Sequence, residues 1–357
     1  MPDLAVLTRR VLRSRLALLL IVAMALAGVG LGRPAVAAKA EAVPLDASFN
    51  PATRAASMVQ VVNADGNGLK GITRAAISSF QVEFVTKGAA SASSYEIGRS
   101  GRANSNLQIT LVGLTPADYQ AITDTLHAEF ERDLKSLGIS VLPTAQVLAS
   151  PAYLKMAASG KPSPTDTRTK DTWSTVFAPA GLGIYGAGSS STAFALLAGL
   201  TAVNDMSSTL FGNLELAKEL DAAVIVVRLV VNFVDLKSSD SSWFGRSSGT
   251  ATVSGQLAPS VAGGGTMFVQ RPGSGNASMT LQAPLLLSDS AFKEVKDTSS
   301  VAANVGLALL SAAIGKGGSA SVVEKEAVAD PAAYRQVVGG GVGMVRAMFM
   351  DRLRAGQ

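Results

Sequence analysis

The sequence predicts an α/β protein in which helices flank a mixed sheet, with long antiparallel hairpin insertions and C-terminal helices. Three stretches of the chain support this prediction. Residues 223–236, AVIVVRLVVNFVDL, are rich in β-branched side chains, as buried strands are. Residues 115–138 repeat apolar side chains at helical spacing, and residues 277–283, ASMTLQA, alternate apolar and polar side chains as a half-buried strand does.

Residues 1–37 are expected to be a signal peptide. Its basic start contains four arginines, Arg9, Arg10, Arg13 and Arg15, and an uncharged apolar run follows at 16–32. The small residues AVAA at 35–38 are typical of a cleavage site, so we expect cleavage near Ala37 or Ala38 and export to the periplasm. The alternative is an uncleaved anchor in the inner membrane.

The basic charge of the chain lies mostly in this N-terminal segment. The sequence has 31 Lys+Arg against 26 Asp+Glu, and with five Arg and Asp3 in residues 1–37, 26 basic and 25 acidic residues remain. A nearly neutral remainder gives no support for a nucleic-acid-binding surface. The chain has no Cys, which excludes disulfides and thiol catalysis and argues against a lipid anchor on an N-terminal Cys.

Residues 38–71 are expected to be a linker and lead-in loop, and residues 72–357 one α/β domain. Strand composition predicts a strand at 72–88, with Phe80, Val82 and Phe84 on one face. The small and polar residues of 89–106 predict a loop or hairpin tip, and a returning strand is expected at 107–113.

The clearest predicted element is a helix at 115–138. Thr115 suits its N-cap, Pro116 its first turn and Gly138 its end. Its apolar stripe consists of Tyr119, Ile122, Leu126, Phe130, Leu134 and Leu137. A short strand at 139–143, a short helix at 151–159 and a loop at 161–171 are expected to follow.

The rest of the chain is predicted to contain five parts: a Gly-rich insert at 179–213, a helix at 213–222 capped by Asn213, the strand at 223–236, a β-hairpin region at 243–287 and a helical tail at 289–357. The first half of the strand at 223–236 should be covered on both faces. The tail should hold one helix at 300–315 and another at 330–356. Gly339, Gly340 and Gly341 weaken the second helix, because each Gly costs about 1 kcal/mol relative to Ala.

One stretch, GLGIYG at 181–186, has the spacing of a dinucleotide-binding turn. Such a turn must end a buried strand and open a helix, whose N–H groups bind the pyrophosphate. Here WSTVFAPA precedes it and the loop-like AGSSST follows, while Asp205 falls near the end of a predicted helix. We therefore interpret the match as a chance result of composition and expect no dinucleotide cofactor.

Other catalytic patterns are equally incomplete. Ser247 lies in GRSSG at 245–249, but the only His, His127, comes earlier in the chain, on the long helix, where we expect it at the edge of the core. Ser290 and Lys293 match S-x-x-K without the other motifs of that site. The sequence therefore predicts no catalytic residues and no enzyme. A periplasmic serine hydrolase using Ser247 is a second alternative.

No metal or cofactor site is predicted. One His and no Cys exclude the usual zinc ligand sets, and Asp235, Asp240 and Asp289 are scattered along the chain. On the long helix, Glu129 and Asp133 stand beside Arg132 and are expected to form a solvated face. The catalytic, cofactor-binding and metal sites are therefore all expected to be absent.

The stretch LAKELDAAVIVVRLVVNFVDL at 216–236 resembles a fold shared by three kinds of bacterial envelope protein. These are the CsgG-like curli secretion channels, the amino-terminal domain of TolB and the lipoprotein activators of penicillin-binding proteins. The helix at 115–138, with ISVLP and LASPAYLKMAASG after it, is similar to the same fold, so the resemblance covers 72–160 and 214–236. Two features depart from the family: the chain has no Cys to carry a lipid, and Asp221 stands where Gly is usual.

The expected signal peptide and the incomplete catalytic motifs predict an exported, non-enzymatic envelope protein. The resemblance implies that it acts as a scaffold, assembly or secretion-accessory factor. Its expected partners are envelope proteins or a second copy of the chain, and no nucleic acid. The first alternative is an assembly inserted in the outer membrane or forming a pore, with the hairpins at 85–110 and 243–283 reaching into the bilayer. Spanning needs ~9–11 alternating residues, and ASMTLQA supplies fewer, which favours the first interpretation.

Overall fold

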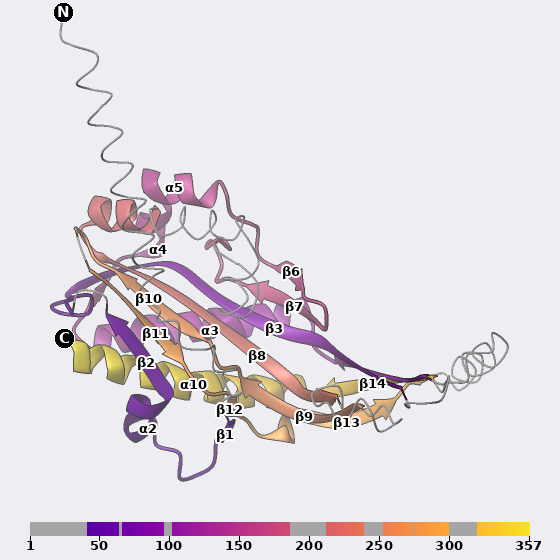
Figure 1. Cartoon of the computed structure of the whole chain (residues 1–357). Coiled ribbons are helices and arrows are strands. Elements are labelled where there is room, and N and C mark those ends of the chain that lie inside the picture. The colour runs from indigo at the N-terminus through magenta and orange to yellow at the C-terminus, as the bar shows by residue number, and fades with distance from the viewer. Residues whose placement is uncertain are drawn as a thin grey trace, which may run out of the picture. The chain divides into compact units, whose positions relative to one another are not determined.

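A computed structural model describes residues 41–63, 66–95, 102–185, 212–238, 253–273, 275–299 and 320–357. The predicted signal peptide at 1–37 lies outside these ranges. The described residues form a curled, mixed sheet of 14 strands with helices packed against it (Figure 1). The predicted α/β fold class, including the C-terminal helix, is confirmed.

The sheet is built around two long strands, β3 (Arg74–Tyr95) and β8 (Ala223–Ser238). They pair in parallel, from Ala75 with Ala223 to Phe84 with Val231. From one end to the other, the main path of the sheet is β1 (Val43–Pro44), β12 (Leu285–Leu286), β9 (Val253–Val261), β8, β3, β4 (Arg102–Val112), β14 (Ala320–Ala329) and β13 (Phe292–Asp297).

The remaining strands branch from this path. The pairs β8–β10, β10–β11 and β11–β2 add β10 (Thr266–Gln270), β11 (Asn276–Leu281) and β2 (Val59–Asn63). On the other side, β3 also pairs with β5 (Ser140–Val141) and with β7 (Thr172–Phe177), which pairs with β6 (Thr165–Arg168). The two halves of β3 thus have different neighbours, with residues 75–84 paired to β8 and residues 87–95 paired to β4.

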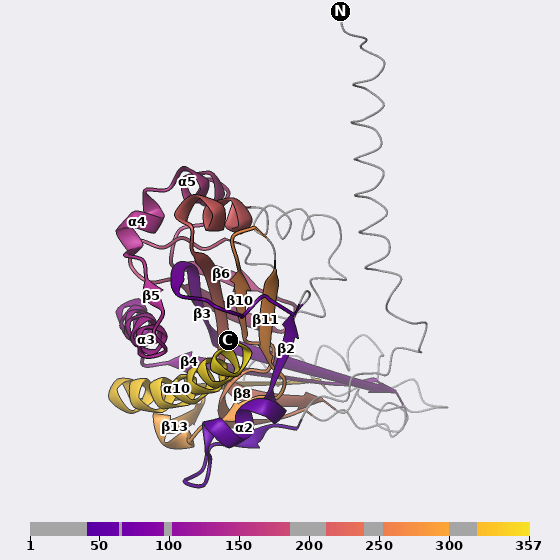
Figure 2. The same cartoon turned by 90° about the vertical axis from the view of Figure 1, so that its left-hand side faces the viewer.

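Two long helices, α3 (Pro116–Ser136) and α10 (Pro331–Gly356), lie side by side on the sheet (Figures 1 and 2). Shorter helices are α2 (Pro51–Met58), α4 (Thr144–Leu148) and α5 (Pro151–Ala157), and residues 212–220 are also helical. The prediction of α3 is confirmed, because the Thr115 hydroxyl accepts a hydrogen bond from the Asp118 N–H and a capping box forms. The Ser150 side chain caps α5 in the same way.

The core lies between β3 and these helices. Phe80, Val82 and Phe84 share one face of β3 and are fully buried, as predicted. The ring of Phe80 lies 5.7 Å from that of Phe130, and the ring of Phe84 lies 4.7 Å from that of Tyr119. The predicted stripe of α3 is therefore the surface that packs on the sheet.

The strand at 223–236 is confirmed as an interior strand, but its two faces are not equally covered. On one face Ile225, Val227 and Leu229 are buried, whereas on the other face Val224 is buried but Val226 and Arg228 are only half-buried. The prediction of full cover on both faces is thus wrong for these two positions.

The predicted linker at 38–71 contains regular structure where the chain is described, namely β1, α2 and β2. The start of α2 has a readable signal, because the Asn50 side chain accepts a hydrogen bond from the Ala52 N–H and Pro51 follows in the first turn. The predicted loop at 161–171 likewise contains β6. The predicted hairpin tip at 89–106 is shorter than expected, because β3 continues to Tyr95 and β4 begins at Arg102.

The C-terminal region differs most from the prediction. The helix expected at 300–315 lies outside the described residues, and two strands, β13 and β14, flank that stretch. By contrast, α10 is confirmed and runs unbroken through Gly339–Gly341, with the Asp330 carboxylate accepting hydrogen bonds at its start.

Two residues around the helix at 212–220 also differ from expectation. The helix begins before Asn213, whose side chain accepts a hydrogen bond from the Ser78 hydroxyl at 2.9 Å instead of capping the helix. After the helix, Asp221 has φ +46°, a left-handed conformation that Gly adopts without strain and that Asp tolerates better than most residues. This conformation explains why Gly suits the position.

Candidate interaction surfaces

The sheet continues beyond the part that the helices cover and forms a strand arm, which we define as residues 87–95, 102–112, 234–238, 253–257 and 320–328 (Figure 1). In this arm, nine successive residues of β3, Lys87–Tyr95, pair with Arg102–Thr110 of β4. On its other side β4 pairs in parallel with β14. The arm is therefore a continuation of the central strands and not a separate loop.

The strand arm has an apolar interior. Leu107 and Ile109 of β4 are buried, and Leu236 of β8 packs near them. Gly255 of β9 allows this approach, because a Cβ there would lie 2.6 Å from Leu236 Cδ2 and 2.9 Å from Leu107 Cδ2. The β8–β9 hairpin thus packs over the β3–β4 hairpin through small and branched side chains.

The opposite face of the β3–β4 hairpin is polar. Ser91 and Asn106 pair across the two strands and are both exposed. Gln108 and Thr110 follow on the same face of β4 and are half-exposed. A face of this composition remains in contact with water or with a polar partner.

An aromatic residue flanked by two cations lies at the base of the strand arm. The ring of Trp173 on β7 has the Lys87 Nζ 4.8 Å from its centre and the Arg168 guanidinium carbon 4.6 Å from it. Lys87, Trp173 and Arg168 are register partners on three adjacent strands, which brings their side chains together. Arg168 is exposed and Trp173 half-buried. Trp and Arg are enriched among the residues that contribute most to protein–protein binding.

A buried carboxylate lies on the face of β3 opposite Phe84. Glu83 is 2% exposed, and its Oε2 lies 3.1 Å from Nη2 of Arg228 on β8. Its Oε1 accepts a hydrogen bond of 2.6 Å from the Ser174 hydroxyl of β7, which in turn lies 2.7 Å from the Thr167 hydroxyl of β6. The cluster therefore links four neighbouring strands at the base of the arm.

Sequence reasoning missed this cluster, although a signal was present. Glu83 is the only charge in the run AISSFQVEFV at 76–85, and Arg228 is the only charge in the apolar run AVIVVRLVV at 223–231. A lone charge in a buried strand needs a partner of opposite sign, since an unpaired buried charge is costly. Two such residues of opposite charge, on strands expected to be neighbours, therefore predict a buried ion pair.

A groove runs along the seam between α3 and α10. It encloses about 390 Å³ and is lined on α10 by Arg335, Gly339, Gly340 and Gly343 and on α3 by Thr125. A second hollow of about 280 Å³ lies further along α10, where Ala347 and Asp351 line it together with the end of α3 and with Pro51 and Ala52 of α2. The seam is thus hollow along much of its length.

Acidic residues of α3 and Arg346 of α10 bridge this seam, which corrects the expectation of a solvated face at Glu129 and Asp133. Arg346 Nη1 lies 2.5 Å from Glu129 Oε2, and its Nε lies 2.5 Å from Asp133 Oδ2. The Arg346 side chain is 15% exposed. The partner is more than two hundred positions away in the chain, so helix spacing alone could not reveal it.

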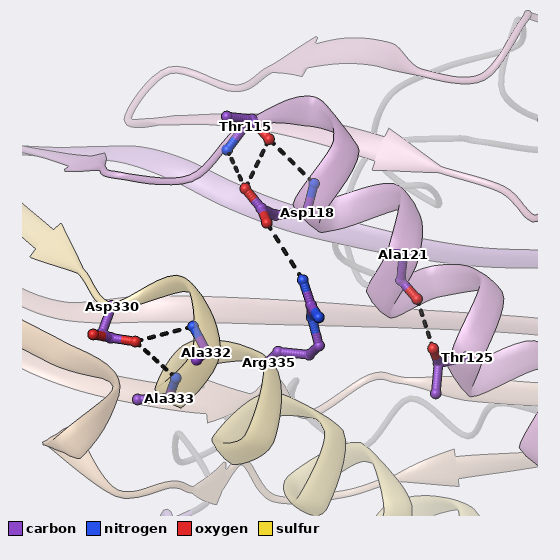
Figure 3. A network of polar contacts seen from close by, with 8 residues as sticks. All are labelled: Thr115, Asp118, Ala121, Thr125, Asp330, Ala332, Ala333 and Arg335. Carbon is purple, nitrogen blue, oxygen red and sulfur yellow. Dashed lines mark hydrogen bonds and ion pairs between the residues drawn. The ribbon is translucent and has the colours of Figure 1, made fainter.

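The N-terminal ends of the two helices are linked in a second place (Figure 3). Arg335 Nη2 lies 3.5 Å from Asp118 Oδ1, and the Thr115 hydroxyl donates to Asp118 Oδ2 at 2.7 Å. Hydrogen bonds from the Thr115 hydroxyl and N–H, together with Arg335, lower the pKa of Asp118. At the start of α10, the Ala333 N–H bonds to Asp330, and this bond and Lys293 lower the pKa of that carboxyl group. Both carboxylates therefore act as helix caps.

The described part of the GLGIYG motif belongs to the core. Leu182, Ile184 and Tyr185 are buried, and the Tyr185 hydroxyl donates a hydrogen bond to the Ser78 carbonyl oxygen. The Gly183 N–H donates to the Tyr153 hydroxyl at 3.3 Å. Gly186 and Asp205 lie outside the described residues.

Of the other residues singled out by the sequence motifs, His127, Ser290 and Lys293 lie in the described part of the chain. Ser247 and Asp240 lie outside the described residues. His127 is 9% exposed, contacts the Phe80 ring edge-on, and has a pKa that burial lowers. Ser290 lies in an exposed turn, while the Lys293 Nζ lies 3.2 Å from the Asp330 carboxylate.

Two further findings concern the ranges that the structure describes. They contain no group of three or more His, Cys, Asp or Glu side chains placed to hold a metal ion. No helix within them combines the length and the apolar character needed to cross a membrane. Comparison with protein-family models, with curated proteins and with solved structures gives no match.

Proposed function

We propose that the protein is an exported cell-envelope protein that acts as a scaffold, assembly or secretion-accessory factor through protein contacts, without a catalytic site. The observation that most supports this role is the strand arm, with the Trp173 cluster (Lys87, Arg168 and Trp173) at its base. A long arm with a polar outer face and an aromatic–cationic cluster offers a large surface for a partner protein. The predicted signal peptide supports export.

The resemblance to CsgG-like proteins, the amino-terminal domain of TolB and the lipoprotein activators is part of this proposal. The left-handed conformation of Asp221, where Gly is usual in that group, is compatible with a shared backbone at this position. So is the parallel pairing of β8 with β3, which joins the two stretches covered by the resemblance.

A second candidate is an assembly whose hairpins enter the outer membrane. One observation favours it: the nine residue pairs of the β3–β4 hairpin reach the ~9–11 residues needed to span a bilayer. The stretch ASMTLQA, whose shortness argued against this candidate in the sequence, forms β11, a short strand in another part of the sheet. The exposed Ser91 and Asn106 favour the first candidate, because hydroxyl and amide groups are costly to place in lipid.

Fractionation and capture from cells would test the proposal. We expect the protein in the periplasmic or outer-membrane fraction, starting near Ala38 or Lys39, and cross-linked there to a specific envelope protein. Trp173→Ala and Arg168→Ala should reduce the yield of this cross-link about tenfold or more, as truncation of a binding hot spot does. The matched control is Lys170→Ala, which removes an exposed cation from the same β6–β7 hairpin.

Two results would contradict the proposal. One is protein that keeps Met1 and remains in the cytoplasm. The other is an unchanged cross-link in both the Trp173→Ala and Arg168→Ala variants. Extraction only with detergent, combined with protection of the β3–β4 hairpin from external protease, would favour the membrane-inserted candidate instead.

A further inference from the structure

The middle of α10 contains glycines that the chain itself does not need. A Cβ at Gly339 or Gly340 would meet no atom within 4 Å, and a Cβ at Gly343 would meet only Nη2 of Arg346, at 4.0 Å. Gly341 differs, because a Cβ there would overlap Leu287. Glycine destabilises the interior of a helix relative to alanine. Internal packing therefore explains Gly341 but not Gly339, Gly340 and Gly343.

These glycines lie on one open face of α10. Gly339, Gly343 and Ala347 are four residues apart, so they follow one another along one side of the helix. Gly339, Gly340 and Gly343 line the 390 Å³ hollow, and Ala347 lines the 280 Å³ hollow beyond it. The open face of α10 is thus small in its side chains and hollow on both sides of Arg346.

Two of the charges on α10, Arg335 and Asp351, lie at equal distances on either side of Gly343. Arg335 stands eight residues before Gly343, and Asp351 eight residues after it. An antiparallel copy of the same helix that crosses at Gly343 at about −50°, the angle that aligns the two i, i+4 ridges, therefore brings Arg335 of one copy level with Asp351 of the other, twice. Gly339 of one copy comes level with Ala347 of the other in the same way.

Both charges can take part in such an arrangement. The side chain of Arg335 is 54% exposed, and its contact with Asp118, at 3.5 Å, leaves further guanidinium donors available. Asp351 is half-exposed and makes no ion pair within the part of the chain that the structure describes. The helix face is self-complementary in both size and charge, as a two-fold interface requires.

We propose that a second copy of this chain packs on this face, with the two α10 helices antiparallel and in close contact at Gly343. Small side chains at the crossing let the two backbones approach closely, and the flanking charges select the antiparallel direction. This inference deepens the proposed role in protein contacts. It depends on α10 and not on the strand arm, so the two proposals can fail separately.

Cross-linking through a new cysteine tests the crossing point directly. The chain has no Cys, so Gly343→Cys would carry a single thiol, which a two-fold contact at this position brings beside its copy. We expect a covalent dimer to form under mild oxidation of the exported protein. The matched control is Leu154→Cys on α5, an exposed apolar position elsewhere, which should form much less dimer. Equal or slower cross-linking of Gly343→Cys would overturn the proposal.

Self-association of the unmodified protein tests the same proposal independently. Light scattering over a dilution series should show a change from two chains to one. Gly343→Leu should weaken this association at least tenfold without lowering the melting temperature of the dilute protein, since the position is open within the chain. Trp173→Ala should leave the association unchanged. A wild-type protein that is one chain at every concentration, or a dimer that Gly343→Leu does not affect, would refute the inference.

Discussion

Two buried tyrosines, Tyr185 and Tyr334, differ in how their hydroxyl groups contribute to the stability of the fold. Burial raises the pKa of both Tyr185 and Tyr334, so both are neutral. The Tyr185 hydroxyl donates to the Ser78 carbonyl oxygen, which links β3 to the segment after β7. The Tyr334 hydroxyl is fully buried and has no hydrogen-bond partner among the residues that the structure describes. The hydrogen-bonded hydroxyl of Tyr185 therefore stabilises the fold, whereas the unpaired hydroxyl of Tyr334 destabilises it.

We predict opposite effects when each of these hydroxyls is removed. Tyr185→Phe should lower the free energy of unfolding by about 1–3 kcal/mol, because it leaves the buried Ser78 carbonyl unpaired. Tyr334→Phe should leave the free energy of unfolding unchanged or raise it by up to about 1 kcal/mol, because it removes an unpaired polar atom. Urea unfolding of the two variants checks this, and a larger loss for Tyr334→Phe would contradict it.

His127 should make the stability of the protein depend on pH. Burial lowers the pKa of its imidazole below the usual 6.5, while Glu131 and Asp124 oppose the shift only in part. As the pH falls below about 6.5, the unfolded chain binds the proton first. The contribution of neutral His127 is therefore complete above that pH and is lost as the pH falls through the folded-state pKa.

His127→Leu should remove this part of the pH dependence. Melting temperatures of wild type and variant, measured between about pH 8 and pH 5, should diverge in favour of the variant on the acid side. The contact with Phe80 is kept in apolar form, so the comparison isolates the charge. A constant difference across the pH range would show that His127 does not titrate between these values.

At the scale of one element, the interior strand β8 and the edge strand β2 provide a matched comparison of a buried and an exposed valine in the same sheet. Val227 is 1% exposed on the face toward α3 and α10, whereas Val62 on the edge strand β2 is 55% exposed. Val227→Asp should lower the free energy of unfolding by several kcal/mol, comparable to the whole stability of a domain. Val62→Asp should change it by no more than about 0.5 kcal/mol. Thermal melts that show equal losses would contradict the place of β8 in the core.

Elements with strong local signals could be predicted from the sequence, and α3 is the best example. Its cap, its first-turn Pro and its apolar stripe all lie within the helix itself. β14 has no such signal, because its parallel pairing with β4 joins segments far apart in the chain. In α10 the local signal is misleading, because the low helix propensity of glycine predicts a weak helix at Gly339–Gly341. Tertiary packing, such as that of Leu287 on Gly341, keeps the helix continuous there.

The candidate surfaces were predicted less well than the elements, for the same physical reason. Phe80, Val82 and Phe84 could be assigned to the core from alternation alone. The contacts of Glu83 with Arg228, and of Asp133 with Arg346, join residues that meet only after folding. A one-dimensional pattern shows which side of an element a charge occupies, but not which partner neutralises it.

At the scale of the whole described chain, one sheet serves two purposes. Its proximal half is covered by α3 and α10 and contains the core, while its distal half continues as the strand arm (Figure 1). The Glu83 cluster lies at the junction and links β3, β8, β7 and β6. The strands of the arm thus continue those of the core in the same direction, but the arm has its own apolar interior at Leu107, Ile109 and Leu236.

This division predicts that the strand arm can be loosened without unfolding the core. Gly255→Val would place side-chain atoms against Leu236 and Leu107, where a Cβ alone would lie 2.6 and 2.9 Å from their methyl carbons. We expect a loss of about 1–3 kcal/mol, as overpacking usually causes. In native-state hydrogen exchange, protection should fall for arm amides of β4 and β9, while amides near Phe80 and Val227 keep wild-type protection. Val62→Asp serves as a control that alters an edge strand outside the arm. If Gly255→Val lowers protection equally throughout the sheet, then arm and core open as one unit, and an arm that adapts independently to a partner is excluded.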